Sequence, residues 1–208
     1  GEVFLARDRC GIKPLLYARC PGAFLFASEL RSLRASGRVP TQVNRQAVWD
    51  YLSLGSVPQP ATILAAVSAL APGMALRVGF DGEPRRAWRW WSLVTAAAPW
   101  RSRLATLDFA AAAAQLRERL EDATRAHLVA DVPVGAFLSG GVDSAAMVAL
   151  MTRALGHPVR TFTVGFPAGT GWPDETQAAA ETARALGSEH HPVVITDADA
   201  AAGFDALV

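Results

Sequence analysis

A glycine-rich turn between a strand-like run and a helix-like run is the feature that most restricts how this chain can fold. The turn has the sequence SGGVDS and occupies residues 139–144. The short apolar run before it, residues 132–138, predicts a buried strand, and residues 145–155, rich in Ala, Val, Leu and Met, predict a helix. In such a turn, free backbone N–H groups and the positive end of the helix dipole favour a bound anion.

The side chains of the turn indicate what kind of anion it would hold. Gly140 and Gly141 lack Cβ atoms, so a phosphate can approach the backbone and positive φ angles are allowed. Ser139 and Ser144 add hydroxyl donors. Asp143 would repel a bare phosphate, which suggests a divalent cation between its carboxylate and the phosphates. We therefore predict a site for nucleotide phosphates.

Two common phosphate-binding motifs are absent. No lysine follows the glycines, as a G-x-x-x-x-G-K-[ST] loop requires, and no G-x-G-x-x-G pattern occurs. Lys13 is the only lysine of the chain. A pair of glycines by itself would indicate only a tight turn. The whole SGGVDS sequence between a strand and a helix favours the phosphate site instead.

Strands and helices are expected to alternate from residue 132 onward. Gly156 and Gly187 follow the two helix-like runs, as C-terminal caps prefer. The expected strands are 132–138, 159–164 and 191–195, and the expected helices are 143–155 and 175–186. This alternation predicts a parallel sheet with right-handed crossovers, whose ligands lie at the carboxyl ends of the strands.

The first half of the chain has a different pattern, with short strands, turns and isolated helices. Ser28 and Asn44 are candidate N-terminal caps of helices that reach residues 34 and 54. Asp108 is expected to cap a long helix. The remaining expected elements are strands at 2–6, 15–18, 23–27, 74–80 and 85–91, and a helix at 109–129. Residues 95–107, rich in Ala, Pro and Arg without clear periodicity, are expected to form a linker.

Composition excludes several classes of protein. The net charge is +1 and 51% of the residues are hydrophobic, so nothing indicates a nucleic-acid or membrane surface. No run approaches the roughly 18 to 20 apolar residues of a membrane span. Cys10 and Cys20 are expected to be buried small residues rather than a disulfide. We therefore expect a cytoplasmic protein.

The loop resembles the pyrophosphate-binding loop, S-G-G-x-D-S, of the N-type ATP pyrophosphatases. Residues 131–145, DVPVGAFLSGGVDSA, are more similar to the glutamine-hydrolysing asparagine synthetases. Other segments resemble that family in the same order, namely RDRCGIKPL at 7–15, FASEL at 26–30, TFTVGF at 161–166, DE at 174–175 and GSEHH at 187–191. The resemblance covers nearly the whole chain.

The resemblance implies two domains of different fold. Residues 1–94 would be the C-terminal part of an α+β, Ntn-hydrolase-like glutaminase domain. Residues 95–107 would be the linker. Residues 108–208 would begin an α/β parallel-sheet domain of the adenine-nucleotide α-hydrolase-like type. Since the chain lacks an initiator Met and ends in a helix-like run, we expect it to be an internal piece of a longer protein.

The resemblance also implies a reaction and a set of binding residues. ATP would adenylate aspartate to β-aspartyl-AMP, and ammonia from glutamine would displace AMP. Val164 would contact adenine through its backbone, and Asp143 would bind Mg²⁺. The implied ATP-binding residues are Leu138, Ser139, Gly140, Gly141, Val142, Asp143, Ser144 and Val164. The partners would be these small molecules, with no nucleic acid and no membrane, and a homodimer is left open.

Other charged residues are given structural roles. The stretch around Arg7, Asp8 and Lys13 resembles a structural segment of the glutaminase domain, and we expect an ion pair that fixes a turn. Asp174 and Glu175 are expected to complement the dipole of the helix that they precede. The corresponding loop of the family lies near the nucleotide, so a secondary role stays open.

The family's catalytic groups are not expected in this chain. Neither Gly1, Cys10 nor Cys20 matches the family's N-terminal catalytic cysteine, and no lysine follows Asp143. We therefore expect this segment to complete neither half-reaction alone. Two alternatives stay open at this stage. One is an adenylating enzyme that forms an amide with an internal amine, like β-lactam synthetases or lasso-peptide cyclases. The other is a nucleotide-binding remnant without turnover.

Overall fold

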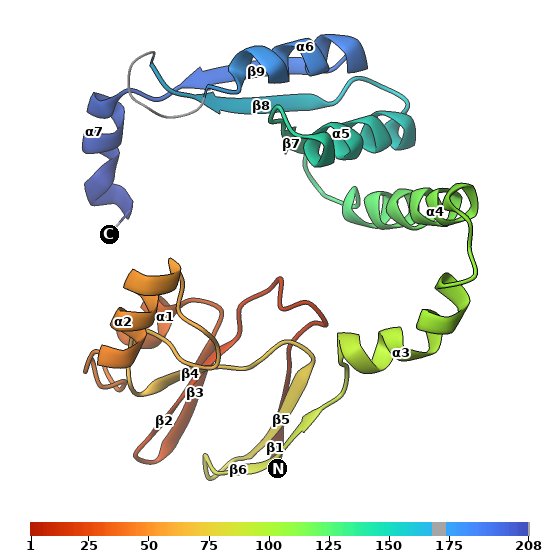
Figure 1. Cartoon of the computed structure of the whole chain (residues 1–208). Helices are drawn as coiled ribbons and strands as arrows, with labels where there is room; N and C mark the ends of the chain where they lie inside the picture. The colour runs from red at the N-terminus through yellow and green to blue at the C-terminus, as the bar shows by residue number, and fades with distance from the viewer. Residues whose placement is uncertain (168–173, 208) are drawn as a thin grey trace. The chain divides into compact units, whose positions relative to one another are not determined.

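The computed structural model describes residues 1–167 and 174–207. Residues 168–173 and 208, which fall within the second predicted domain, lie outside the described residues. The chain divides into two compact units, Gly1–Thr106 and Leu107–Val208 (Figure 1). Each unit is described by itself.

The first unit contains two three-stranded antiparallel sheets. In one sheet β5 is central, and in the other β2 is central (Figure 1). The first sheet has the order β1 (Glu2–Ala6), β5 (Met74–Gly79), β6 (Pro84–Arg89), and the second has the order β3 (Ala23–Ala27), β2 (Leu16–Cys20), β4 (Val67–Ala69). The expected strands are all present, whereas the three-residue β4 has too short a pattern to be predicted.

Each sheet of the first unit buries its own apolar cluster. Alternate residues of β5, Leu76 and Val78, are buried against Leu5 of β1 and against Leu70. The second cluster lies under β2 and α1 (Leu30–Ala35) and contains Ala18, Leu33, Val39, Leu64 and Val67. Because a strand places alternate side chains on one face, Leu76 and Val78 reach the same cluster, whereas Leu33 comes from α1 and Val39, Leu64 and Leu70 come from segments between the strands.

The two expected helices of the first unit are present near their predicted bounds, but only one of the two predicted N-terminal caps is correct. Asn44 caps α2 (Arg45–Leu54), and its side chain accepts a 3.3 Å bond from the N–H of Ala47. The prediction of a Ser28 cap is wrong, because Glu29 occupies the N-cap position of α1 and makes no side-chain capping bond. The apolar residues of α2 are largely exposed in this unit, with Trp49 at 68%.

A helix replaces the expected linker conformation. Residues Leu93–Leu104 form α3, although Pro99 lies inside it and none of its residues is buried. The Ala-rich composition explains why a helix forms here without an apolar stripe, since Ala has the highest intrinsic helix propensity. Most of the stretch at 95–107 is therefore helical, and its role as a linker stays a prediction.

The second unit is built on the predicted parallel sheet. Its order is β7-β8-β9, and the register places Phe137 beside Phe162 and Phe162 beside His191. The strands are β7 (Gly135–Phe137), β8 (Arg160–Gly165) and β9 (Glu189–Val194), and the helices are α4 (Phe109–His127), α5 (Val142–Leu155), α6 (Thr176–Leu186) and α7 (Asp197–Leu207). Gly156 and Gly187 end α5 and α6 in the left-handed conformation, as predicted.

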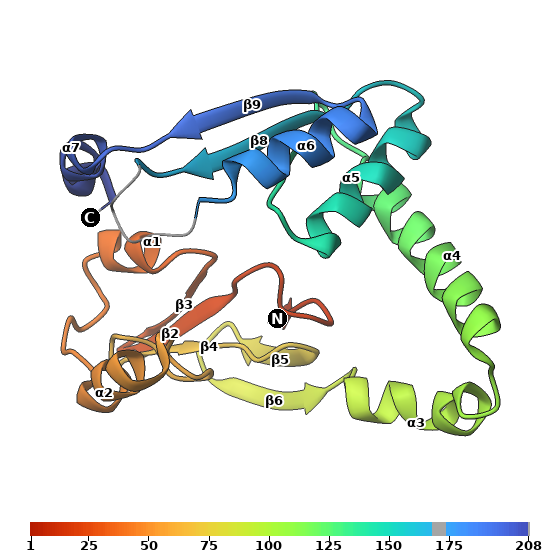
Figure 2. The same ribbon diagram turned by 45° about the horizontal axis from the view of Figure 1, so that its top comes forward.

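One face of this sheet is buried under α5 and α6. Val148 of α5 and Ala179 and Ala183 of α6 form one cluster with Leu138. Figure 2 shows α6 lying along β8 and β9. Along β8, Thr163 faces this core, whereas Val164 is 41% exposed on the opposite face. The loop after β7 is thus anchored where the sheet and both helices meet.

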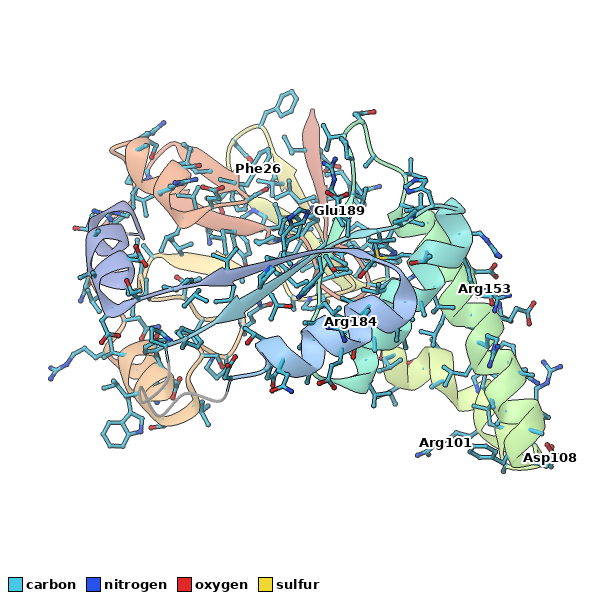
Figure 3. The ribbon with its side chains drawn as sticks, turned by 90° about the horizontal axis from the view of Figure 1, so that it is seen from above. Phe26, Arg101, Asp108, Arg153, Arg184 and Glu189 are labelled. Atoms are coloured by element: carbon cyan, nitrogen blue, oxygen red, sulfur yellow. The ribbon has the colours of Figure 1, made fainter. Side chains whose placement is uncertain are left out.

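The long helix α4 packs against α5. Asp108, labelled in Figure 3, caps it by accepting a 2.7 Å bond from the N–H of Ala111. Glu121 pairs with Arg125 at 3.5 Å and with Arg153 of α5 at 3.8 Å. Thr124 of α4 is fully buried, whereas Leu116 is 60% exposed.

Among the described residues, no helix combines the length and the apolar character that crossing a membrane demands.

Candidate functional site

The loop at residues 139–144 starts from a buried anchor. Leu138 is 2% exposed, and its N–H donates a 2.8 Å bond to the carbonyl of Phe162 on β8. The hydroxyl of Thr163 donates to the carbonyl of Leu138 from the neighbouring strand. Both backbone groups of Leu138 are therefore satisfied by β8, which fixes where the loop leaves the sheet.

Two serine side chains hold the loop in shape. The Oγ atoms of Ser139 and Ser144 lie 2.8 Å apart, and the Ser144 hydroxyl also donates to the carbonyl of Gly141 at 3.0 Å. The N–H of Ser139 donates to Ser144 Oγ, and the N–H of Gly141 donates to Ser139 Oγ, both at 3.2 Å. The serines predicted as ligand donors thus also form a hydrogen-bonded ring within the loop.

The glycines of the loop are needed for space rather than for an unusual conformation. Neither Gly140 nor Gly141 has a positive φ angle, so the loop does not use the conformational freedom that glycine allows. A Cβ on Gly140 would lie 3.1 Å from Cβ of Ala178 on α6, and one on Gly141 would lie 3.2 Å from Ser139 Oγ. The absent side chains therefore let α6 and the serine ring approach the backbone.

The first turn of α5 presents unsatisfied donors. Within the described residues, no acceptor is found for the backbone N–H groups of Val142, Asp143 and Ser144. Helices leave such groups free at their N-termini, where the helix dipole adds positive potential. Three free N–H groups in successive residues form a surface that fits a phosphate group.

Asp143 has the environment that a metal-binding carboxylate needs. Its side chain is exposed, and no hydrogen bond or ion pair to it is found among the described residues. No group of three metal-ligating side chains occurs in the described part of the chain. A single free carboxylate fits Mg²⁺ that arrives with a nucleotide, because Mg²⁺ is often held by one or two carboxylates plus phosphates.

Val164 lies close to the loop through the sheet register. Phe137, the last residue of β7, pairs with Phe162, so Val164 lies two residues beyond that pair on β8. It pairs with Val193 on the other side. The parallel sheet therefore brings the predicted adenine contact and the loop to the same carboxyl edge, as ligand sites of such sheets require.

Glu175 is a contact of the loop that the sequence did not reveal. Its carboxylate Oε2 accepts a 3.2 Å hydrogen bond from the N–H of Gly140. The neighbouring Asp174 accepts bonds from the N–H and the hydroxyl of Thr176, and these bonds lower the pKa of the Asp174 carboxyl. The expectation that both acids serve the helix is thus met by Asp174, whereas Glu175 reaches 35 residues back to the loop.

In the first unit, Arg7 and Asp8 do not form the predicted ion pair. Arg7 is 5% exposed and donates to the carbonyls of Lys13, Leu70 and Gly11, at 2.7 to 2.9 Å, and to the side chain of Gln59 at 2.6 Å. The prediction fails because backbone carbonyls, rather than a carboxylate, satisfy the guanidinium.

Asp8 instead organises the loop that follows it. Its carboxylate accepts from the N–H groups of Cys10, Ile12 and Lys13 at 3.0 to 3.2 Å. The bonds from Lys13 and then Ile12 are the main reason that the pKa of Asp8 lies below its usual value. Cys10 and Cys20 are both unbridged, as predicted, but Cys10 is exposed and Cys20 is half-buried, so the expectation that both are buried was wrong.

Comparison with protein families divides the chain into two matches. Residues 1–91 match the model of the glutamine amidotransferase domain, and residues 115–208 match the model of asparagine synthase. The loop at 139–144 and all of β7, β8 and β9 lie within the second match.

Curated relatives match across both parts. Asparagine synthetase [glutamine-hydrolyzing] 3 of Bacillus subtilis is 32% identical over 95% of this chain and 33% of its own length. Asparagine synthetase [glutamine-hydrolyzing] 1 of the same species is 33% identical over 92% of this chain and 28% of its own length. The amidase chyE of Penicillium rubens is 32% identical over 98% of this chain and 31% of its own length.

The chain therefore spans about a third of the length of the curated relatives that it matches. The two family matches follow each other in the order that the sequence motifs had indicated. A glutamine amidotransferase segment followed by an asparagine synthase segment, with relatives of 32 to 33% identity across both, identifies the chain as a member of the glutamine-hydrolysing asparagine synthetase family.

Proposed function

We propose that the whole protein makes asparagine from aspartate, using ATP and the amide nitrogen of glutamine, and that the loop at 139–144 holds the pyrophosphate part of ATP. The observation that carries this proposal is the loop's geometry. Among the described residues, the backbone N–H groups of Val142, Asp143 and Ser144 have no acceptor, and they lie at the carboxyl edge of a parallel sheet. The family membership supports the reaction, and the free donors support this loop as the place of phosphate binding.

The finer fold assignments belong to the same proposal. We infer that residues 1–94 are part of an Ntn-hydrolase-like glutaminase domain and that residues 95–107 connect it to the next. Residues 108–208 would begin an adenine-nucleotide α-hydrolase-like domain. The two antiparallel sheets of the first unit and the parallel sheet of the second support this division. We also expect the enzyme to act on small molecules in the cytoplasm, and a homodimer stays a prediction.

The proposed first half-reaction is transfer of AMP. An oxygen of the aspartate side-chain carboxylate attacks the α-phosphorus of ATP. The bond between that phosphorus and the bridging oxygen of the β-phosphate breaks, and pyrophosphate leaves with the electron pair. The loop donors at Val142, Asp143 and Ser144 would stabilise the charge on the leaving pyrophosphate because they are already aligned before the reaction. Ammonia then attacks the activated carbonyl carbon and displaces AMP.

Asp143 fits a role beside the leaving group. Its carboxylate is exposed and uncommitted among the described residues, at the start of α5. When bound there, Mg²⁺ would neutralise charge on the pyrophosphate. Val164 would position the adenine through its backbone. Its side chain is 41% exposed, so the surface beside it is open. No residue of this chain is assigned a catalytic role.

The alternatives are less well supported. Enzymes that close a ring with an internal amine, such as β-lactam synthetases, do not need glutamine, whereas the relatives' names specify glutamine hydrolysis. A nucleotide-binding remnant without turnover would also use the free donors, so the argument against it is that the relatives' names specify synthetases. The fungal relative named an amidase is one reason to test acceptors other than aspartate.

The test is release of pyrophosphate from ATP by the full-length protein, with and without aspartate. We expect release only with a carboxylate substrate, and loss of release in Asp143→Ala. Gly141→Val should block nucleotide binding, because its side chain would crowd Ser139 Oγ. Val142→Ala is the matched control, since the side chain of Val142 is 83% exposed and only its backbone is proposed to act.

The result that would overturn the proposal is equally specific. Pyrophosphate release by Asp143→Ala at the wild-type rate would remove the metal role. Wild-type ATP affinity in Gly141→Val, measured by calorimetry, would remove the loop from the nucleotide site. Aspartate-dependent release without formation of asparagine would move the reaction to a different amine donor.

A further inference from the structure

Glu175 places a negative charge against a loop that is predicted to bind an anion. An N–H group of a predicted phosphate site, that of Gly140, donates its hydrogen bond to a carboxylate instead. Glu175 is exposed, and no cationic partner for it is found among the ion pairs of the described residues. The negative charge is therefore held at the loop by the loop's own donor.

The position of the Glu175 carboxylate is not explained by capping of α6, the helix that Glu175 precedes. Glu175 occupies the N-cap position of α6, but its side chain makes no capping bond. Asp174 satisfies the first N–H of that helix instead, by accepting from Thr176 at 2.9 Å. Because the local capping is already done, the direction of the Glu175 side chain toward Gly140 is independent of helix capping.

The surroundings are those that an anion prefers. Gly140 directly precedes Gly141, the N-cap of α5, and the carboxylate comes from the N-cap of α6. The first turns of both helices are close together, since a Cβ on Gly140 would lie 3.1 Å from Cβ of Ala178. The positive ends of two helix dipoles thus act on one small region, and a carboxylate oxygen occupies a donor there.

We propose that Glu175 is a positioning residue whose carboxylate occupies the Gly140 N–H in the nucleotide-free protein and is displaced when the pyrophosphate part of ATP enters. This inference rests on the proposed function, because it takes the loop to be the pyrophosphate site. A phosphate oxygen and a carboxylate oxygen compete for the same donor, and their charges repel. Binding of the nucleotide therefore includes the release of Glu175, which weakens the affinity and opens the contact between the loop and α6.

The test measures binding of inorganic pyrophosphate without metal, and of ATP with Mg²⁺, to the full-length protein by calorimetry. Glu175→Gln keeps the size of the side chain and removes its charge. We expect both ligands to bind about tenfold more tightly to this variant, because a neutral amide competes less well than a carboxylate for a donor. Glu181→Gln is the matched control, since it removes the same charge from an exposed position of the same helix.

A second variant separates the hydrogen bond from the charge. Glu175→Asp keeps the charge but is one methylene shorter, so it should no longer reach the Gly140 N–H across the present 3.2 Å contact. We expect this variant also to bind pyrophosphate more tightly than the wild type. Tight binding by Glu175→Gln with unchanged binding by Glu175→Asp would show a general charge effect and would overturn the proposed occupancy.

The Gly140 amide itself gives a readout that does not depend on turnover. In an NMR titration with pyrophosphate, its resonance should shift in the wild type as the acceptor changes from carboxylate to phosphate. In Glu175→Gln the resonance should already differ before pyrophosphate is added. A Gly140 resonance that is the same in both proteins and does not respond to the ligand would contradict the proposal.

The remaining outcomes separate this proposal from the proposed function. Weaker binding of ATP with Mg²⁺ in Glu175→Gln would mean that the carboxylate is a metal ligand, and would overturn displacement. Equal affinities in wild type and Glu175→Gln would overturn the role of Glu175 while leaving the loop as the nucleotide site. No binding of either ligand by any variant would overturn both proposals together.

Discussion

The hydroxyl oxygens of Ser139 and Ser144 lie 2.8 Å apart across the glycine-rich loop. Ser144 also accepts from the N–H of Ser139 and donates to the carbonyl of Gly141, so it closes the loop from inside. The free donors of the first turn of α5 are aligned before any ligand arrives. Such prior alignment is what makes hydrogen-bond donors effective for a charged leaving group.

Removing the Ser144 hydroxyl should therefore weaken ligand binding more than it weakens the fold. Ser144→Ala leaves the N–H of Ser139 without its acceptor, which costs about 1 to 3 kcal/mol at a partly buried site. Because this cost falls on the conformation of the loop that binds the ligand, pyrophosphate affinity measured by calorimetry should fall about tenfold. Ser144→Thr, which keeps a hydroxyl, should restore most of the affinity. Ser102→Ala, at an exposed position of α3, should change nothing. Equal affinities in Ser144→Ala and the wild type would contradict the role of the serine pair.

Two valines of α5 separate packing from surface effects. Val148 is fully buried in the cluster beneath the sheet, whereas Val142 is 83% exposed. Val148→Ala should lower the free energy of unfolding by about 2 kcal/mol, through lost burial and a residual cavity. Val142→Ala should change it by less than about 0.5 kcal/mol. Urea denaturation checks both, and similar effects of the two changes would mean that α5 does not pack as described.

Arg7 should not be replaceable by lysine. Its guanidinium donates hydrogen bonds to four acceptors in a buried site, and an ammonium group cannot reproduce that planar arrangement of donors. Arg7→Lys should lower the free energy of unfolding by about 3 kcal/mol, because at least two bonds to a charged donor are lost. Arg9→Lys is the control at an exposed position two residues away. A urea midpoint unchanged by Arg7→Lys would show that the buried bonds contribute nothing net.

Asp8 should make the stability of the first unit dependent on pH in the acid range. The N–H groups of Lys13 and Ile12 hold the pKa of its carboxyl below the usual 3.8 in the folded state. The stabilisation is therefore present above the unfolded pKa and is lost as the pH falls through the lower folded value. Asp8→Asn should be less stable than the wild type at pH 7 and at pH 5, and the difference should shrink below pH 4.

Denaturation with urea at several pH values measures this difference. Asp131→Asn is the control, because Asp131 is exposed and no hydrogen bond or ion pair to it is found among the described residues. A gap between wild type and Asp8→Asn that stays constant from pH 7 to pH 3 would contradict the assignment.

The sequence by itself determined the elements that depend on local chemistry. Asn44 and Asp108 cap their helices as expected, because an N-cap side chain needs only the N–H groups of the next turn. Gly156 and Gly187 end α5 and α6 for the same local reason. The strand–loop–helix order around residues 139–144 predicted the parallel sheet, since parallel strands need a crossover between them.

Only the tertiary structure decided which partners the polar groups found. Arg7 and Asp8 are neighbours in sequence with opposite charges, yet each is satisfied by backbone groups that the fold brings near. Glu175 meets Gly140 because α6 packs beside α5 on one face of the sheet, and no local pattern encodes that approach. Local hydrogen bonds follow from residue type and spacing, whereas contacts across 35 residues follow from packing, which a single sequence does not display.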